Sequence, residues 1–409
     1  MKHLVICGIL FATFTFFCTA QEKNPIGKEQ VAKLNKAGLE LFKDITLNDK
    51  KGNVFISPFS INSAFGMVYA GAKGETASQI SKVLGLPEKQ DESNSLMMSL
   101  LQYYNKNEKR SVYISNSVWM AKDQTVLPGY ATVMNKNFQA TPFHEDFAKS
   151  AEVAKKMNDF IEKNTNGMLK NMMDSSAIQP DMKMVLLNTL YFSAKWSKKF
   201  AKDKTVDDKF NLFGGEKADI RMMYQKDRFK YYADKEVNMH LLSMFYEQGK
   251  YELLLIMPQN AESGDAGEKD LAKIIEFLPE KFDAWRVAAK YDSVQVWVPK
   301  TKITGKLSLG SQLQKLGMKD AFNDKADFSG ISGKKDLFIS YVLHQTALEM
   351  DEESTRAAAA TAIAMNRMSL MPSREETKMF RVDRPFIAMI LDTTNNNILF
   401  VGRITNPTK

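Results

Sequence analysis

Hydrophobic and polar residues follow two different periods along the chain, which predicts a mixture of helices and strands. Over residues 28–47, apolar side chains recur at helical spacing, as Val31, Leu34 and Leu41 do, and this predicts an amphipathic helix. Further helices are predicted over residues 62–69, 76–84, 93–104 and 151–164. Apolar runs predict strands over residues 112–120, 184–193, 251–257, 294–298, 337–342, 386–391 and 398–401. Helices dominate the first half and strands the second, so we predict an α+β fold.

One long segment, residues 351–383, does not fit this pattern. It joins two predicted strands and runs through a charged start, an alanine block and a methionine-rich stretch. Propensity alone predicts a helix over residues 356–365, because alanine is the best helix former. A connection of this length is uncommon inside a compact domain unless the loop itself is functional.

The start of the chain has the layout of an export signal. An apolar run over residues 4–17 follows two polar residues and is too short to cross a bilayer as a helix. Residues 1–20 are therefore predicted to be a signal peptide that is cleaved after Ala20. A second interpretation is a lipoprotein signal that ends at Cys18, whose acyl chain would anchor the protein at the cell surface.

Composition indicates a protein with a sizeable core. The 409 residues are 44% hydrophobic and 25% charged, which excludes a disordered or collagen-like chain. No compositional break divides the chain, so we expect residues 21–409 to form a single domain. The net charge of +8 is spread along the chain and supports solubility more than nucleic-acid binding. The only cysteines are Cys7 and Cys18, so a mature chain without them has no disulfide or thiolate site.

No catalytic motif stands out. The segment 330–333 resembles a serine-hydrolase elbow but has the wrong spacing. His144 and Glu145 lack the second histidine of a zinc helix, and there is no phosphate loop or dinucleotide fingerprint. We therefore expect no catalytic residue, no metal and no cofactor, and an exported hydrolase remains an alternative without supporting residues.

Several short motifs follow one another in a recognisable order. They include NVFISPFS at 53–60, GAKGET at 71–76, NDFIEKNTNG at 158–167, LNTLYF at 187–192, ADFSG at 326–330, RPF at 384–386 and FVGR at 400–403. Over roughly residues 30–407, this series resembles the serpins, a family of serine protease inhibitors. The resemblance implies a serpin fold with three β-sheets, about nine helices and an exposed reactive-centre loop at about residues 352–383. We expect a secreted member of the inhibitory type, from a bacterial source.

The resemblance also implies a mechanism and its partners. In serpins, a target protease attacks the loop and forms an acyl-enzyme, and the freed loop enters the central sheet before the acyl-enzyme is hydrolysed. The partners would be serine proteases, or also cysteine proteases, held in covalent complexes. We expect a monomer with no membrane span and no nucleic-acid partner. The alternative is a non-inhibitory serpin that acts as a protease substrate or as a ligand-binding carrier.

The scissile bond follows from counting within the loop as for inhibitory serpins. Seventeen residues from Glu352 lead to Met368 as the scissile residue, with Ser369 after it and Arg367 as the neighbouring alternative. Met368 predicts elastase-, chymotrypsin- or subtilisin-like targets. Arg367 predicts trypsin-like targets. Both residues remain candidates for the scissile residue.

The first part of the loop is expected to be the hinge. By resemblance, the hinge residues are Glu352, Glu353, Ser354, Thr355, Arg356, Ala357, Ala358, Ala359 and Ala360. An inserted strand must place alternate side chains under the sheet, and the set that starts at Thr355 is small or apolar through Met365. Arg356 then stays in solvent. Ser354 replaces the glycine that relatives usually have, and its Cβ restricts the hinge, which favours the non-inhibitory alternative.

Two further groups of residues would control the opening of the sheet. By resemblance, Ser57, Ser60, Asn188 and His344 form the shutter, a polar cluster beneath the central strands. Trp196, Lys300 and Glu352 form the breach, the point where the loop first enters, and Lys300 and Glu352 are expected to form an ion pair there.

Overall fold

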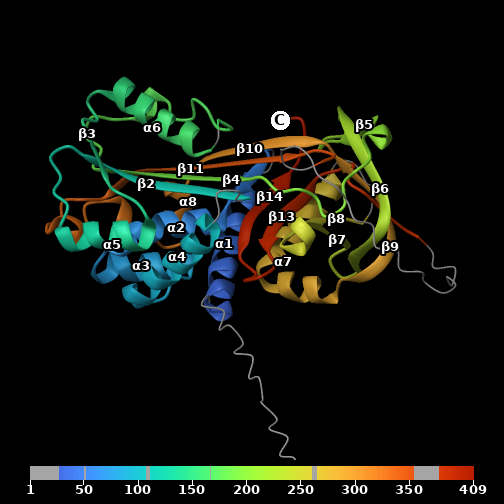
Figure 1. The fold of residues 1–409 in the computed structure, drawn as a ribbon, viewed down its shortest axis with the longest axis horizontal. Coiled ribbons are helices and arrows are strands. Elements are labelled where there is room, and N and C mark those ends of the chain that lie inside the picture. Colours follow the sequence, from blue (N-terminus) through green and yellow to red (C-terminus); the bar gives the residue numbers. More distant parts are fainter. Residues whose placement is uncertain (1–26, 50–51, 107–110, 166, 260–264, 354–376) are drawn as a thin grey trace, which may run out of the picture.

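A computed structural model describes residues 27–49, 52–106, 111–165, 167–259, 265–353 and 377–409 of the chain (Figure 1). The predicted signal peptide, with Cys18, lies outside the described residues. So do hinge residues 354–360, the helix that propensity predicts over 356–365, and the scissile candidates Arg367, Met368 and Ser369.

The described residues contain nine α-helices. They are α1 (Lys28–Asn48), α2 (Pro58–Tyr69), α3 (Gly74–Leu84), α4 (Gln90–Asn105), α5 (Pro128–Phe138), α6 (Ser150–Asn164), α7 (Asp265–Ala288), α8 (Gly310–Lys315) and α9 (Ser329–Ser332). Helix α2 begins four residues before its predicted start, because Ser57 caps it and a proline occupies its first turn. Helix α7 was not predicted, and its internal Pro279 interrupts the helical signal. No helix in the described part is long and apolar enough to cross a membrane.

Five strands form the central sheet. In spatial order they are β10 (Thr301–Ser308), β11 (Ile339–Met350), β4 (Met184–Phe192), β2 (Val112–Ala121) and β3 (Phe143–Glu145). Strand β11 extends eight residues beyond its predicted end at 342, because polar residues such as Gln345 and Thr346 are buried in the sheet and hide the strand signal. Strand β4 is buried at all nine positions, as expected for a strand covered on both faces.

Nine further strands form a second hydrogen-bonded network. They are β1 (Val54–Ile56), β14 (Ile398–Ile404), β13 (Phe386–Asp392), β8 (Tyr251–Pro258), β7 (Met239–Tyr246), β6 (Lys217–Asp234), β9 (Lys290–Pro299) and β12 (Lys378–Arg381), with β5 (Val206–Asn211) beside β6. The long strand β6 pairs with β5 and β9 along most of its length and with β7 at its end. It thereby joins the second and third of the three expected sheets.

The central sheet lies between two layers of helices. Helix α6 covers one face, α2 and α4 lie against the other, and α3 and α5 pack beside them on that side (Figure 1). Beneath α6, side chains such as Met157 and Ile161 pack with Leu187 and Leu343 of the sheet. The larger core lies on the opposite face and continues to α1, α7 and the second network. The central strands therefore cannot part without disturbing packed side chains on both faces.

Candidate functional site

The centre of the site is the seam between β11 and β4. These two strands pair in parallel from Ile339 opposite Met184 to Ala347 opposite Tyr191. Their outer neighbours, β10 and β2, are antiparallel to them. A strand that turned back from the end of β11 and entered the seam would run antiparallel to both of its new neighbours.

The four predicted shutter residues meet under this seam and are fully buried. His344 of β11 lies in register with Asn188 of β4, and its Nδ1 hydrogen-bonds the Asn188 side-chain oxygen. Its Nε2 accepts a hydrogen bond of 2.9 Å from the backbone N–H of Ser57. Asn188 donates to the backbone and the hydroxyl of Ser60. The cluster therefore connects both strands of the seam to the start of α2.

These hydrogen bonds determine the protonation state of His344. Because Nε2 accepts from a backbone N–H, it carries no proton, and Nδ1 must be the donor to Asn188. The ring is thus the neutral Nδ1–H tautomer. Burial without a nearby carboxylate lowers the pKa of His344 to about 3. No catalytic role follows, since both ring nitrogens are already occupied.

Asn116 is a member of this cluster that the sequence did not reveal. It lies on β2 in register with Asn188, accepts a hydrogen bond from the Asn188 amide, and donates one of 2.7 Å to Ser63. Asn116 lies with Ser115 and Ser117 in a polar stretch inside the predicted strand, and this stretch was a usable signal. The polar cluster therefore spans three adjacent strands.

The predicted breach residues meet at the end of the same two strands. Trp196 follows β4, and its indole N–H donates a 2.8 Å hydrogen bond to the backbone carbonyl of Asp351, which follows β11. The indole stacks on Tyr246 at a centroid distance of 4.1 Å and contacts the edge of Phe200. One side chain thus ties together the ends of the two parallel strands.

Glu352 is held by its side chain and by its backbone. Its carboxylate lies 2.9 Å from the Lys300 ammonium, and its carbonyl accepts a 2.9 Å hydrogen bond from the N–H of Phe200. Burial alone would raise the pKa of Glu352, but the hydrogen bond from Lys300 helps to hold the pKa below its usual value. Glu353, the last hinge residue described, pairs with Lys202 at 2.5 Å. The chain is therefore anchored through the first two of the predicted hinge residues.

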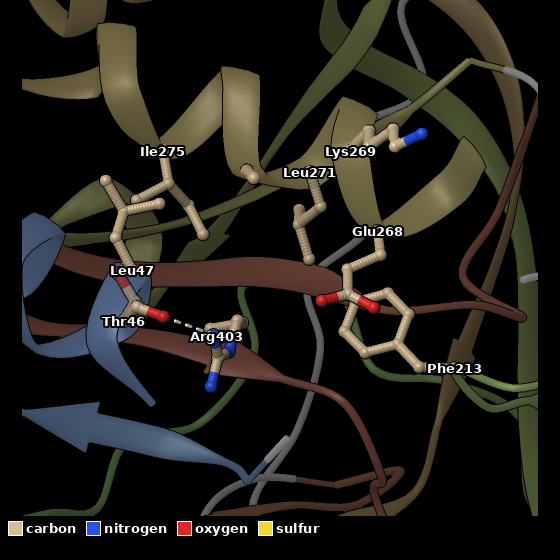
Figure 2. Close-up of a pocket in the computed structure, with 9 residues that line it drawn as sticks. Thr46, Leu47, Phe213, Glu268, Lys269, Leu271, Ile275 and Arg403 are labelled. Atoms are coloured by element: carbon tan, nitrogen blue, oxygen red, sulfur yellow. Dashed lines mark hydrogen bonds between the residues drawn. The ribbon is translucent and has the colours of Figure 1, made fainter. Parts of the chain in front are cut away.

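A separate pocket lies between α1, α7 and β14. Its volume is about 320 Å³, and Leu47, Leu271 and Ile275 are among the residues around it (Figure 2). Arg403 also lines it and donates a 2.7 Å hydrogen bond to the Thr46 carbonyl. The Nε of this buried guanidinium has no hydrogen-bond partner among the described residues. Across the described part of the chain, no group of three metal-ligating side chains occurs.

Comparison with known proteins assigns this arrangement to a family. The family model described as "Serpin (serine protease inhibitor)" matches residues 32–407. The chain is 33% identical to leukocyte elastase inhibitor A of Mus musculus over 384 residues, which is 93% of the chain and 100% of that relative. It is 34% identical to the leukocyte elastase inhibitor of Homo sapiens over 386 residues, with the same coverage. These relatives are vertebrate, and the bacterial source stays a prediction.

Solved structures show the same fold. A serpin of the insect Tenebrio molitor has a TM-score of 0.80 and 27% identity, covering 95% of this chain and 99% of that chain. Human thyroxine-binding globulin with thyroxine has a TM-score of 0.82 at 24% identity, covering 93% and 99%. The three-sheet α+β serpin fold is thereby confirmed, and the chain belongs to the serpin family of serine protease inhibitors.

Proposed function

We propose that the protein is a secreted suicide inhibitor of serine proteases, which traps the acyl-enzyme by inserting its reactive-centre loop between β11 and β4. The observation that carries this proposal is the parallel pairing of β11 and β4 at the seam. The loop continues the chain directly from the end of β11. An inserted strand replaces one parallel pair with two antiparallel pairs, and antiparallel pairing is the more stable per residue.

The loop sequence is compatible with this insertion. From Thr355 to Met365, the alternate side chains that would face the core are small or apolar. Arg356 would face solvent and so avoid the cost of a buried, unpaired charge. The stretch from Thr355 to Met368 would span roughly 46 Å when extended at about 3.3 Å per residue, enough to carry a bound protease along the length of the sheet.

The target class follows from the scissile residue. We infer cleavage after Met368 by elastase-, chymotrypsin- or subtilisin-like proteases, with Arg367 as the trypsin-directed alternative. The relatives named as leukocyte elastase inhibitors support an apolar scissile residue. Cysteine proteases remain a second class of partner.

The test is incubation of the protein with elastase, subtilisin and trypsin, followed by denaturing gels. A detergent-stable adduct is expected, and mass spectrometry of the released C-terminal peptide should show a start at Ser369, or at Met368 if Arg367 is used. Cleavage without any adduct would refute inhibition. A peptide that starts outside positions 366–371 would refute the assigned scissile bond.

A second candidate function is that of a carrier serpin. Two observations favour it: Ser354 at the hinge, and the pocket between α1, α7 and β14. The pocket combines apolar side chains with the charged Glu268, Lys269 and Arg403, which suits a small amphiphilic ligand. Titration with the fluorescent anion anilinonaphthalene sulfonate tests this candidate, with Ala272→Met as a variant that fills the pocket. Binding that this variant does not weaken would argue against a carrier role.

Export is proposed from residues 1–20 alone. Intact mass of the protein from cells that express the full chain distinguishes the two interpretations. Cleavage after Ala20 gives a mature chain that starts at Gln21, whereas acylation gives a chain that starts at a lipid-modified Cys18. A chain that keeps its first twenty residues would refute both.

A further inference from the structure

The packed layer beneath α6 is rich in methionine. It consists of side chains from α6, from the segment that follows α6, and from the facing strands of the central sheet, and we call it the α6 layer. Its methionines are Met157, Met168, Met172, Met173 and Met182. Methionine is flexible and fills irregular gaps, and its sulfur is open to oxidation. The chemistry of these sulfurs therefore bears on how firmly α6 is held.

The α6 layer covers one face of the seam between β11 and β4. Leu343 and Ala347 of β11 belong to it, as do Val185 and Leu187 of β4. His344 of the shutter alternates with these residues along β11, so it points to the opposite face. A change that loosens the α6 layer therefore uncovers the seam on the face opposite the shutter.

The segment that follows α6 is fastened to the helix. The side chain of Asn158 donates a 2.9 Å hydrogen bond to the Met173 carbonyl and accepts one of 2.8 Å from the Met173 N–H. Lys170 forms an ion pair of 2.5 Å with Glu162 of the helix. The segment is thus held against α6, which fixes where its methionines lie.

Exposure distinguishes two of these methionines. Met173 is buried, whereas Met168 and Met172 are only partly buried at the edge of the α6 layer, where they are two of its eight partly buried residues. Methionines of the larger core, such as Met67 and Met97, are fully buried. Among the described residues that pack against that core while partly buried, none is methionine. A small oxidant in solution therefore reaches the α6 layer before it reaches the larger core.

We propose that Met168 and Met172 are sites of reversible oxidation, and that their oxidation loosens α6 from the central sheet. Hydrogen peroxide transfers one oxygen atom to each thioether sulfur, which is oxidised to a sulfoxide, and the peroxide is reduced to water. The sulfoxide either stays in the layer as a polar group without a donor or draws its side chain out into water. Both outcomes weaken the packing. The inference goes beyond the proposed function and does not depend on it, because it concerns only how α6 is held.

The experiment treats the full chain with hydrogen peroxide and follows hydrogen–deuterium exchange of the α6 backbone amides, which reports local opening. Peptide mass spectrometry gives the sulfoxide fraction at each methionine. The variant is Met168→Leu with Met172→Leu, which nearly conserves the packed volume. The matched control is Met379→Leu, which removes a 64% exposed methionine on β12, outside the α6 layer.

We expect sulfoxide at Met168 and Met172, and exchange of the α6 amides at least about ten-fold faster than before treatment, which corresponds to about 1.4 kcal/mol. The control should respond like the wild type, and the variant should keep its slow exchange. Methionine sulfoxide reductase should restore slow exchange in the wild type.

Three results would overturn the proposal. In the first, Met168 and Met172 remain thioethers while Met379 is oxidised. In the second, both are oxidised but exchange of the α6 amides is unchanged. In the third, the variant is accelerated as much as the wild type, so that oxidation elsewhere is the cause. Should the variant exchange fast before any treatment, the wild type decides, because its acceleration must rise with the sulfoxide fraction at these two positions.

Discussion

The buried histidine of the seam predicts how the protein loses stability in acid. An unfolded chain takes up a proton on His344 near its ordinary pKa of 6.5, whereas the native chain does so only near a pKa of about 3. The pKa shift of His344 therefore adds to the free energy of unfolding in full above pH 6.5. This contribution is lost as the pH falls from 6.5 towards 3. At pH 4.5, two pKa units below the ordinary value, the loss is about 3 kcal/mol.

The assay compares wild type with His344→Gln, which retains a donor and an acceptor but takes up no proton. The midpoint of the first urea-unfolding transition is measured from pH 7.5 to pH 4.5 and converted into a free energy of unfolding. The difference between the two proteins should shrink by about 3 kcal/mol across this range. Burial lowers the pKa of His240 to about 4. His240 and the other titrating groups are the same in both proteins, so their contributions to the free energy of unfolding cancel in this difference.

His144→Gln is the matched control, because His144 is exposed and lies outside the cluster. It should follow the wild type at every pH. A difference between wild type and His344→Gln that stays constant with pH would refute the assignment of a buried neutral histidine. As the pH approaches 3, spontaneous loss of inhibitory activity in the wild type should also become faster, since protonation of Nε2 removes the acceptor of the Ser57 N–H and breaks the hydrogen bond that ties β11 to the start of α2.

Three further predictions concern opening of the sheet. Cleavage at Met368 should raise the melting temperature markedly, and calorimetry that finds the cut form no more stable would refute insertion. Glu352→Lys places a second cation beside Lys300 and should promote premature insertion or polymerisation on heating; an unchanged monomer on size-exclusion chromatography would contradict this. Asn116→Ala leaves the buried Asn188 amide without one acceptor and should cost about 1–3 kcal/mol in urea unfolding, whereas an unchanged midpoint would argue against a role in the cluster.

Local sequence patterns predicted much of the secondary structure but failed where tertiary contacts override local preference. The amphipathic helix over 28–47 carries a strong periodic signal and the mostly apolar β4 a strong apolar run, and both elements are present. Strand β6 was missed because its exposed face is charged and only some of its residues are buried. Helix α7 was not predicted, because Pro279 inside it interrupts the helical signal.

The motifs were sufficient to place the chain in the serpin family and to name residues that the structure brings together, whose roles as shutter and breach stay predictions. Only the tertiary structure decided that Asn116 joins the cluster, that His344 is the neutral Nδ1–H tautomer, and that Trp196 joins the ends of β4 and β11. The physical reason is that burial and hydrogen-bond partners depend on segments that lie far apart in the chain, between 72 and 287 residues in these three cases. Sequence periodicity reports which face of an element is apolar, but it carries no information on which distant element will cover that face.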